Sequence, residues 1–313
     1  MRFERRPHRP AFIAEIGLNH NGSPELAYDL CVEATRAGAT AVKLQYFKTS
    51  EFMHPSDPDF NRRQEHELDA DELTWLVGKL EEARIAWGAT PLGLESLDNL
   101  ATFKPHFIKI ASGDITFAPL IQAASGLGKP VILSTGASNL PEITQAVLLV
   151  RHKSGREPVI LHCVSLYPTV LKDAKLSFMQ TLQTAFPDAV VGISDHSVSP
   201  DVSFLATALG AAVIEKHFTS DVNQDGYDHH MSLDARGVSR HVAAVASAKE
   251  IMGAPDDDRP TYVSLANTLI GLFTLIAASF GLVAQYFGPA VQLYFFSGLL
   301  LLCIALSFKL KAV

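Results

Sequence analysis

The sequence predicts an α/β fold, a closed (β/α)8 TIM barrel followed by a two-helix transmembrane hairpin. Eight short apolar runs alternate with stretches that carry helix signals, and each run ends in a polar or ionisable residue. Eight such units in roughly 220 residues are what a closed parallel barrel requires. The runs predicted as strands are 12–17, 40–45, 85–90, 106–114, 130–136, 158–163, 190–196 and 212–218.

Helix-start signals stand between these runs. Ser23-Pro24-Glu25 offers an N-cap, a proline in the first turn and an early acid, and Gly38 ends that helix. Asp69, Asn139 and Ser199 are predicted to begin three more helices. The connection after the second run is long and charged, which is typical of a lid or binding loop.

The bulk composition excludes some classes of function. A formal net charge of −7 and a pI near 5.9 argue against a general nucleic-acid binder, whose affinity comes from phosphate contacts. Cys31, Cys163 and Cys303 lack C-x-x-C spacing, so neither a disulfide framework nor a thiolate zinc site is indicated. The basic first ten residues are followed by no apolar core, so we expect no secretory signal.

The composition divides the chain into three predicted parts. Residues 1–254 form the barrel, 255–264 a polar linker, and 265–313 the hairpin. The stretches 265–287 and 290–308 carry no charged residue, and each is long enough to cross a membrane as a helix. The alternative is a buried apolar hairpin, but a helix of a soluble protein should show a polar stripe.

The flanking charges predict an orientation for this hairpin. Lys309 and Lys311 follow the second span, whereas the turn between the spans is uncharged. The positive-inside rule then places the barrel in the cytoplasm, anchored to the inner face of the cytoplasmic membrane.

The strand ends carry chemistry that a packed core does not need. In a TIM barrel the C-terminal ends of the strands gather on one face and build the active site. The residues expected there are Glu15, Lys43, Gln45, Thr90, Lys109, Ser112, Asp114, Ser134, His162, Asp195, His196, Glu215, Lys216 and His217.

Two histidines at neighbouring strand ends predict a metal site. His196 and His217 follow the seventh and eighth runs, and two such imidazoles can share one divalent ion. The alternative is a pair of structural histidines. Asp195 and Glu215 are expected to fix the orientation of the rings.

Lysines and hydroxyls form a second constellation, Lys43, Lys109, Thr90, Ser112, Ser134 and Ser194. Converging in a barrel mouth, they suit a ligand that carries a phosphate and a carboxylate. The alternative is that the lysines only reach solvent. Strand alternation is expected to turn Lys216 away from the mouth. Glu15 is a candidate general base, or a partner for a nearby lysine.

Several motifs taken together resemble the sialic acid synthase family, which includes N-acetylneuraminate, legionaminate and pseudaminate synthases and a spore-coat polysaccharide protein. The resemblance runs in order over residues 11–252 and touches every predicted strand. The motifs are AEIGLNHNGS, VKLQ, ATPLG, IKIASGD, ILSTGAS, LHCVSLYPT, GISDHS and IEKHFT.

The resemblance implies an activity in surface carbohydrate biosynthesis. Phosphoenolpyruvate would condense with an N-acylated hexosamine to give a nine-carbon 2-keto acid and phosphate. It implies that His196 and His217 hold Mn²⁺ or Mg²⁺, and that Glu15, Asp114 and Lys43 act in catalysis. The implied phosphoenolpyruvate contacts are Lys43, Thr90, Lys109, Ser112, Ser134, Ser165 and Ser194. The implied sugar contacts are Gln45, Tyr167 and Asp228.

The chain also departs from this family. Position 114 is Asp where much of the family has Glu, and position 165 is Ser where some members have Asn. DGYDHHMSL (225–233) replaces the usual phrase at the sugar end. We expect the small antifreeze-like C-terminal domain to be absent. Its place is taken by a tail resembling the last two helices of a major facilitator transporter, either as an anchor or as the scar of a fusion.

Three hypotheses follow. The first is the condensing synthase, with small-molecule substrates, no nucleic acid and a homodimer left open. The second is an aldolase that forms a Schiff base on Lys43 or Lys109. The third is a truncated, catalytically impaired binding barrel fused to a membrane anchor.

Overall fold

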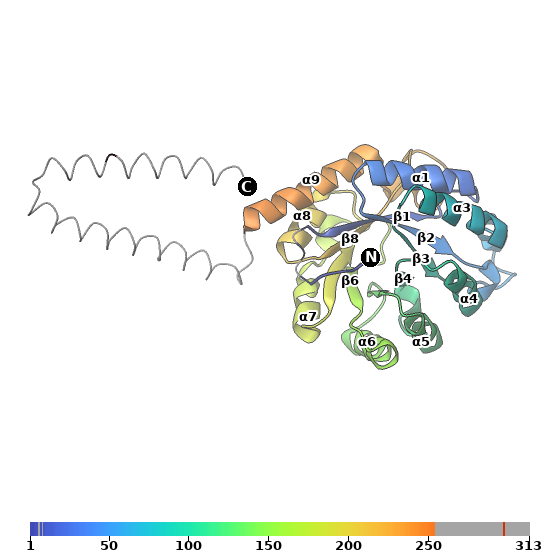
Figure 1. Cartoon of the computed structure of the whole chain (residues 1–313), viewed down its shortest axis with the longest axis horizontal. Coiled ribbons are helices and arrows are strands. Elements are labelled where there is room, and N and C mark those ends of the chain that lie inside the picture. Colours follow the sequence, from blue (N-terminus) through green and yellow to red (C-terminus); the bar gives the residue numbers. More distant parts are fainter. Residues whose placement is uncertain (6, 8, 254–296, 298–313) are drawn as a thin grey trace, which may run out of the picture. The chain divides into compact units, whose positions relative to one another are not determined.

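The computed structural model describes residues 1–5, 7, 9–253 and 297. Met1–Met252 form one compact unit, a closed barrel in which each strand pairs in parallel with the next and β8 pairs with β1 (Figure 1). The strands are β1 (Ala11–Gly17), β2 (Ala41–Tyr46), β3 (Trp87–Pro91), β4 (Ile108–Ile110), β5 (Val131–Ser134), β6 (Val159–Cys163), β7 (Val190–Ser194) and β8 (Val213–His217). The predicted (β/α)8 barrel is confirmed.

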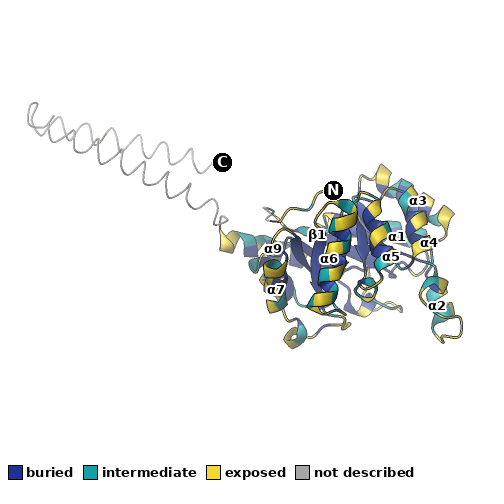
Figure 2. Ribbon diagram, turned by 90° about the horizontal axis from the view of Figure 1, so that it is seen from below, coloured by how far each residue is buried: buried dark blue, intermediate teal, exposed yellow. Residues whose placement is uncertain are grey.

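Helices surround the barrel, and Figure 2 shows their exposed outer faces over a buried sheet. They are α1 (Pro24–Arg36), α2 (Phe60–Gln64), α3 (Ala70–Glu82), α4 (Leu94–Thr102), α5 (Ala118–Gly126), α6 (Leu140–Ser154), α7 (Ser177–Ala185), α8 (Pro200–Ala208) and α9 (Ala235–Met252). The last of these closes the ring between α8 and α1 (Figure 1).

The predicted helix starts are confirmed by their caps. The side chain of Ser23 accepts a hydrogen bond from the amide of Leu26, and that of Ser199 accepts one from Asp201. Asp69 and Asn139 each form a capping box with the glutamate three residues later. Each box satisfies two amides that a helix start would otherwise leave without partners.

Two apolar layers stabilise the barrel. The larger lies between the sheet and the helices and includes Leu30, Leu73, Leu76 and Ile143. The smaller fills the lower interior around Phe107, whose ring takes the space beside Gly88, where an added Cβ would lie 2.4 Å from it. This packing positions the strand ends above it.

The fourth strand is shorter than predicted. Only Ile108–Ile110 pair as a strand, because the chain turns into a 3₁₀ helix at Ser112–Asp114. That turn places Ser112 and Asp114 beyond the C-terminal end of β4.

The C-terminal predictions lie outside the described residues. The linker 255–264 and, Ser297 apart, the hairpin 265–313 belong to the part that the structure does not describe. Among the described residues, no helix has the length and apolar character needed to cross a membrane. The membrane anchor, its orientation, the transporter-like tail and the homodimer therefore stay predictions.

Candidate active site

Strand alternation selects the side chains that enter the barrel mouth. Along β8, Glu215 and His217 point into the barrel and Lys216 points between the sheet and the helices. The register sets Glu15 of β1 opposite both Lys43 of β2 and His217. The register of β1 against β2 then shifts between Glu15 and Gly17, as happens at bulges beside active sites.

Four charged side chains form a buried cluster in the mouth. Lys43 pairs with Glu15, and its Nζ donates to Thr90 Oγ1 at 2.8 Å. Lys109 Nζ lies 2.7 Å from Glu215 Oε1, and Lys43 Nζ lies 3.9 Å from Glu215 Oε2. These four residues are between 1% and 4% exposed. Glu215 therefore pairs with both lysines, a role that the sequence had not indicated.

The two carboxylates of this cluster differ in their electrostatics. Burial raises the pKa of Glu15, although Lys43 opposes the shift. Burial also acts on Glu215, but Lys109 and Lys43 outweigh it and hold the pKa of Glu215 at about 2. Glu15 is thus the acid of the cluster more readily protonated, which suits a group that accepts or returns a proton.

Hydroxyls line the next part of the mouth. Ser112 Oγ accepts a hydrogen bond from the Gly136 amide at 3.0 Å, and a Cβ at Gly136 would lie 2.6 Å from Ser165 Oγ. Ser194 Oγ donates to Glu215 Oε1 at 2.8 Å. Ser134 Oγ is buried and has no hydrogen-bond partner among the described residues. Such a group is satisfied by a ligand or by water, so these hydroxyls form a candidate anion cradle.

The two predicted metal ligands lie side by side. The ring centroids of His196 and His217 are 5.5 Å apart, and the Tyr167 ring lies 4.1 Å from that of His196. His196 Nδ1 lies 2.9 Å from the Val164 carbonyl, to which it can donate, leaving Nε2 free to bind a cation. His217 Nδ1 is buried without a hydrogen bond among the described residues and lies 3.5 Å from Asp228 Oδ2.

These residues fit a divalent cation held by few protein ligands. Burial, with His217 adding to it, lowers the pKa of His196 to about 4, so the ring is neutral as a metal ligand must be. Within the described part of the chain, no group of three His, Cys, Asp or Glu side chains forms a closed cage. Two imidazoles would leave the remaining positions of the ion open to substrate and water.

Asp228, one of the candidates for the sugar contact, lies beside Gly17. A Cβ built on Gly17, whose φ is +54°, would lie 3.3 Å from both Asp228 Oδ2 and Glu15 Oε1. Gln45 Nε2 donates to Glu15 Oε1 at 3.3 Å. Asp114 lies half-buried on the turn after β4, and burial raises its pKa.

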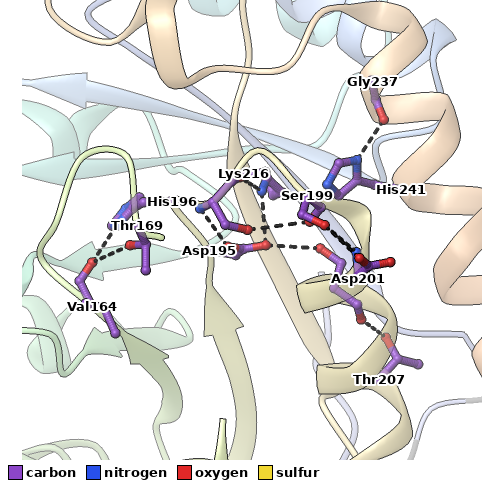
Figure 3. Close-up of polar contacts among 12 residues, drawn as sticks. Val164, Thr169, Asp195, His196, Ser199, Asp201, Thr207, Lys216, Gly237 and His241 are labelled. Carbon is purple, nitrogen blue, oxygen red and sulfur yellow. Dashed lines mark hydrogen bonds and ion pairs between the residues drawn. The ribbon is translucent and has the colours of Figure 1, made fainter. Parts of the chain in front are cut away.

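The structure corrects the expectations for Asp195 and His162 and confirms that Lys216 points outward; Asp195 and Lys216 are drawn in Figure 3. Asp195 does not orient an imidazole, because its Oδ2 lies 3.0 Å from Lys216 Nζ and its Oδ1 accepts from the Ser197 amide. Lys216 does face away from the mouth, but it is buried in this ion pair. His162 is not in the mouth either, because its Nε2 lies 2.7 Å from the Ala174 carbonyl behind the sheet. Alternation along the strands explains all three.

Comparisons with known proteins show similarity in sequence and fold. Residues 30–257 match the NeuB family. An N,N'-diacetyllegionaminic acid synthase of Campylobacter jejuni is 36% identical, the match covering 77% of each chain. An N-acetylneuraminate-9-phosphate synthase of Drosophila melanogaster is 33% identical over 76% of this chain and 67% of its own. The crystal structure of an N-acetylneuraminic acid synthetase from Leptospira borgpetersenii superposes with a TM-score of 0.75 at 33% identity, covering 84% and 93% of the two chains.

Proposed function

The chain belongs to the NeuB family, and we propose that it condenses phosphoenolpyruvate with an N-acylated hexosamine to a nine-carbon 2-keto sugar acid, with release of phosphate. The observation that carries the proposal is the convergence of Lys43, Lys109 and the serine hydroxyls beside a pair of imidazoles. A phosphate and a carboxylate on one small molecule need this density of cations and donors.

Of the two buried lysines, Lys43 suits anion binding better than Schiff-base chemistry. Burial lowers the pKa of Lys43, but Glu15 and Glu215 outweigh it and raise that pKa above its ordinary value. A protonated, ion-paired amine is a poor nucleophile and a good ligand for a phosphate. Burial lowers the pKa of Lys109, although Glu215, whose Oε1 lies 2.7 Å from Lys109 Nζ, opposes the shift, so a Schiff-base reaction would use Lys109.

In the proposed reaction, C3 of phosphoenolpyruvate forms a bond to the aldehyde carbon of the hexosamine. Water adds at C2, and the bond from C2 to the phosphate oxygen breaks. His196 and His217 would hold Mn²⁺ or Mg²⁺, and the bound ion would supply Lewis acidity toward the aldehyde oxygen. Lys43, Lys109 and the serines orient the enol phosphate, while Glu15 and Asp114 hold or accept protons beside the reacting carbons.

A phosphate-release assay tests this function. Full-length protein is incubated with phosphoenolpyruvate and a panel of N-acylhexosamines, with and without Mn²⁺. We expect phosphate, and a product of the summed carbon count by mass spectrometry, only when acceptor and metal are both present. No turnover with any acceptor in a metal-replete preparation would contradict the proposal. A lysine adduct trapped by borohydride, with activity indifferent to EDTA, would indicate the Schiff-base aldolase instead.

A further inference from the structure

The loop that follows β8 is held at the barrel mouth by α2. The Tyr227 hydroxyl donates to Asp59 Oδ2 at 2.7 Å. The guanidinium carbons of Arg62 and Arg63 lie 4.4 and 3.9 Å from the centroid of the Tyr227 ring. The ring of His66 contacts it edge-on at 5.1 Å. We call these four residues around Tyr227 the tyrosine clamp.

The base of the clamp is anchored to the barrel at both ends of the β2–α3 connection. At one end, Glu51 accepts hydrogen bonds from the amides of Glu95 and Ser96 at the start of α4, at 2.8 and 3.1 Å. At the other, Glu67 Oε1 accepts from the Thr49 amide at 2.7 Å. The helix α2 between these anchors buries none of its own residues. Its contact with Tyr227 is therefore one of the few contacts that fix its position.

The clamp has a direct geometric consequence for the next residue. Asp228 follows Tyr227 in the chain, so their Cα atoms are about 3.8 Å apart and a fixed ring restricts where the carboxylate can lie. Its Oδ2 lies 3.5 Å from His217 Nδ1 and faces the space beside Gly17. The short contacts of the cradle lysines come from the strands: Lys43 bonds to Thr90 and pairs with Glu15, and Lys109 pairs with Glu215. The Asp228 carboxylate acts on Lys43 only as the last of the causes that raise the Lys43 pKa.

We propose that Tyr227 is a positioning residue which, held by the tyrosine clamp, sets Asp228 at the sugar end of the pocket and so determines affinity for the acceptor sugar. The inference rests on the proposed function, since it assigns the Asp228 end to the N-acylhexosamine. The lysines at the phosphoenolpyruvate end take their hydrogen bonds and short ion pairs from Thr90 and Glu215 and not from the clamp. Loss of the clamp therefore weakens one substrate and spares the other.

Steady-state kinetics of Tyr227→Leu test this split. The variant removes both the hydroxyl bond and the cation–aromatic contacts, and we expect KM for the N-acylhexosamine to rise about tenfold with kcat and KM for phosphoenolpyruvate within twofold. Tyr227→Phe keeps the ring between the two arginines, so its KM for the sugar should rise less. The double variant Arg63→Ala, Tyr227→Leu should have nearly the same KM for the sugar as Tyr227→Leu alone, because the two substitutions remove the same contact.

Tyr28→Leu is the matched control. Tyr28 of α1 contacts the Trp75 ring edge-on at 6.3 Å, on the outer helices and away from the mouth. We expect this variant to change neither KM. An unchanged sugar KM in Tyr227→Leu, or an equal rise in both KM values, would overturn the proposal.

Amide hydrogen exchange measures how firmly the tyrosine clamp holds these segments and needs no turnover, so its result stands even if the proposed function fails. Faster exchange in both 59–66 and 226–229 of Tyr227→Leu, with α1 unchanged, would support the coupling. Unchanged exchange across 59–66 would show that Tyr227 does not hold α2, and would overturn the clamp itself.

Discussion

The two ends of the barrel interior have opposite chemistry although the same strands build them. Residues two positions apart on four strands lie in successive layers with side chains on the same face. The lower members are Ile13, Ala41, Phe107 and Val213, and the upper members are Glu15, Lys43, Lys109 and Glu215. Two residues along a strand span about 6.6 Å, so over that distance the barrel interior changes from an apolar layer to a layer in which all four side chains are ionisable.

The two layers differ in what they contribute to stability. The lower layer removes apolar surface from water, which stabilises the fold. The upper layer takes four charges out of water, and buried ion pairs of this kind add little or nothing to stability compared with apolar side chains of the same size. The Lys216–Asp195 pair is buried as well, but it lies behind the sheet, so it is the position of the four charges at the strand ends that marks them as a candidate ligand site.

The size of a depression does not by itself mark the end of the barrel that holds the candidate site. A depression of about 610 Å³ lies at the bottom of the barrel, beside Phe3, Lys129 and Arg156. Its cations are only partly buried or exposed. The mouth, by contrast, holds buried charges and a hydroxyl, Ser134, without a partner among the described residues.

The largest effect is expected from removing charge in the upper layer. The pair Lys109→Met and Glu215→Gln should lower kcat/KM about a thousandfold, because the anion site loses its best-paired cation. Its free energy of unfolding should stay within about 1 kcal/mol of wild type, whereas Lys109→Met alone should cost about 3 kcal/mol by leaving a buried charge less compensated. Urea unfolding and phosphate release measure the two quantities. A double variant that is active, or far less stable than the single variant, would contradict the claim that the upper layer binds the ligand and adds little to stability.

The lower layer should show the reverse pattern. Phe107→Ala should lower the free energy of unfolding by about 3–5 kcal/mol, because it leaves a cavity beside Gly88. Below its unfolding transition the variant should keep the wild-type KM values. Phe117, 41% exposed on the surface, is the matched control, and its alanine variant should change stability by less than about 0.5 kcal/mol. A large change in KM in Phe107→Ala would mean that the layers are not separate.

A pH effect of middle size is expected from His20, in the loop after β1. Burial lowers its pKa from 6.5 to about 4, with His66 adding to the shift. The unfolded chain binds this proton more readily, so the stability linked to neutral His20 is complete above pH 6.5 and is lost as the pH falls toward 4. The loss should be ~2 kcal/mol by pH 5 and ~3 kcal/mol by pH 4. Unfolding of wild type and His20→Gln at both pH values measures the difference, and exposed His152 on α6 supplies the control. Parallel pH profiles for the two proteins would refute it.

The smallest effect is expected at the bottom depression. Lys129→Ala should change the free energy of unfolding by less than about 0.5 kcal/mol, and kcat/KM should stay within twofold of wild type. The same phosphate-release assay checks it. A large loss of activity would place functional chemistry at the lower end as well.

Much of the barrel could be predicted from the sequence because its signals are local. Apolar runs, caps such as Asp69 and Asn139, and the ionisable residues at strand ends all lie within a few residues of the structure that they specify. Alternation also predicted that Lys216 faces away from the mouth. The site residues assembled where parallel strands place their ends.

The pairing of those residues could not be read from the sequence. The partners of Glu215 and Asp195 depend on contacts between strands, and the expectation that both orient imidazoles was wrong for that reason. The tyrosine clamp joins residues 168 positions apart, Asp59 and Tyr227. Its only local signal was a long, charged loop with adjacent arginines.

Calorimetric titration of phosphoenolpyruvate tests where the anion binds, since it needs neither the acceptor sugar nor turnover. In the presence of Mn²⁺, we expect wild type and Lys129→Ala to bind phosphoenolpyruvate alike and the Lys109→Met, Glu215→Gln double variant to show no measurable binding. Binding by the Lys109→Met, Glu215→Gln double variant equal to that of wild type would contradict the assignment of the anion site to the charged upper layer. Loss of binding in Lys129→Ala would contradict it as well.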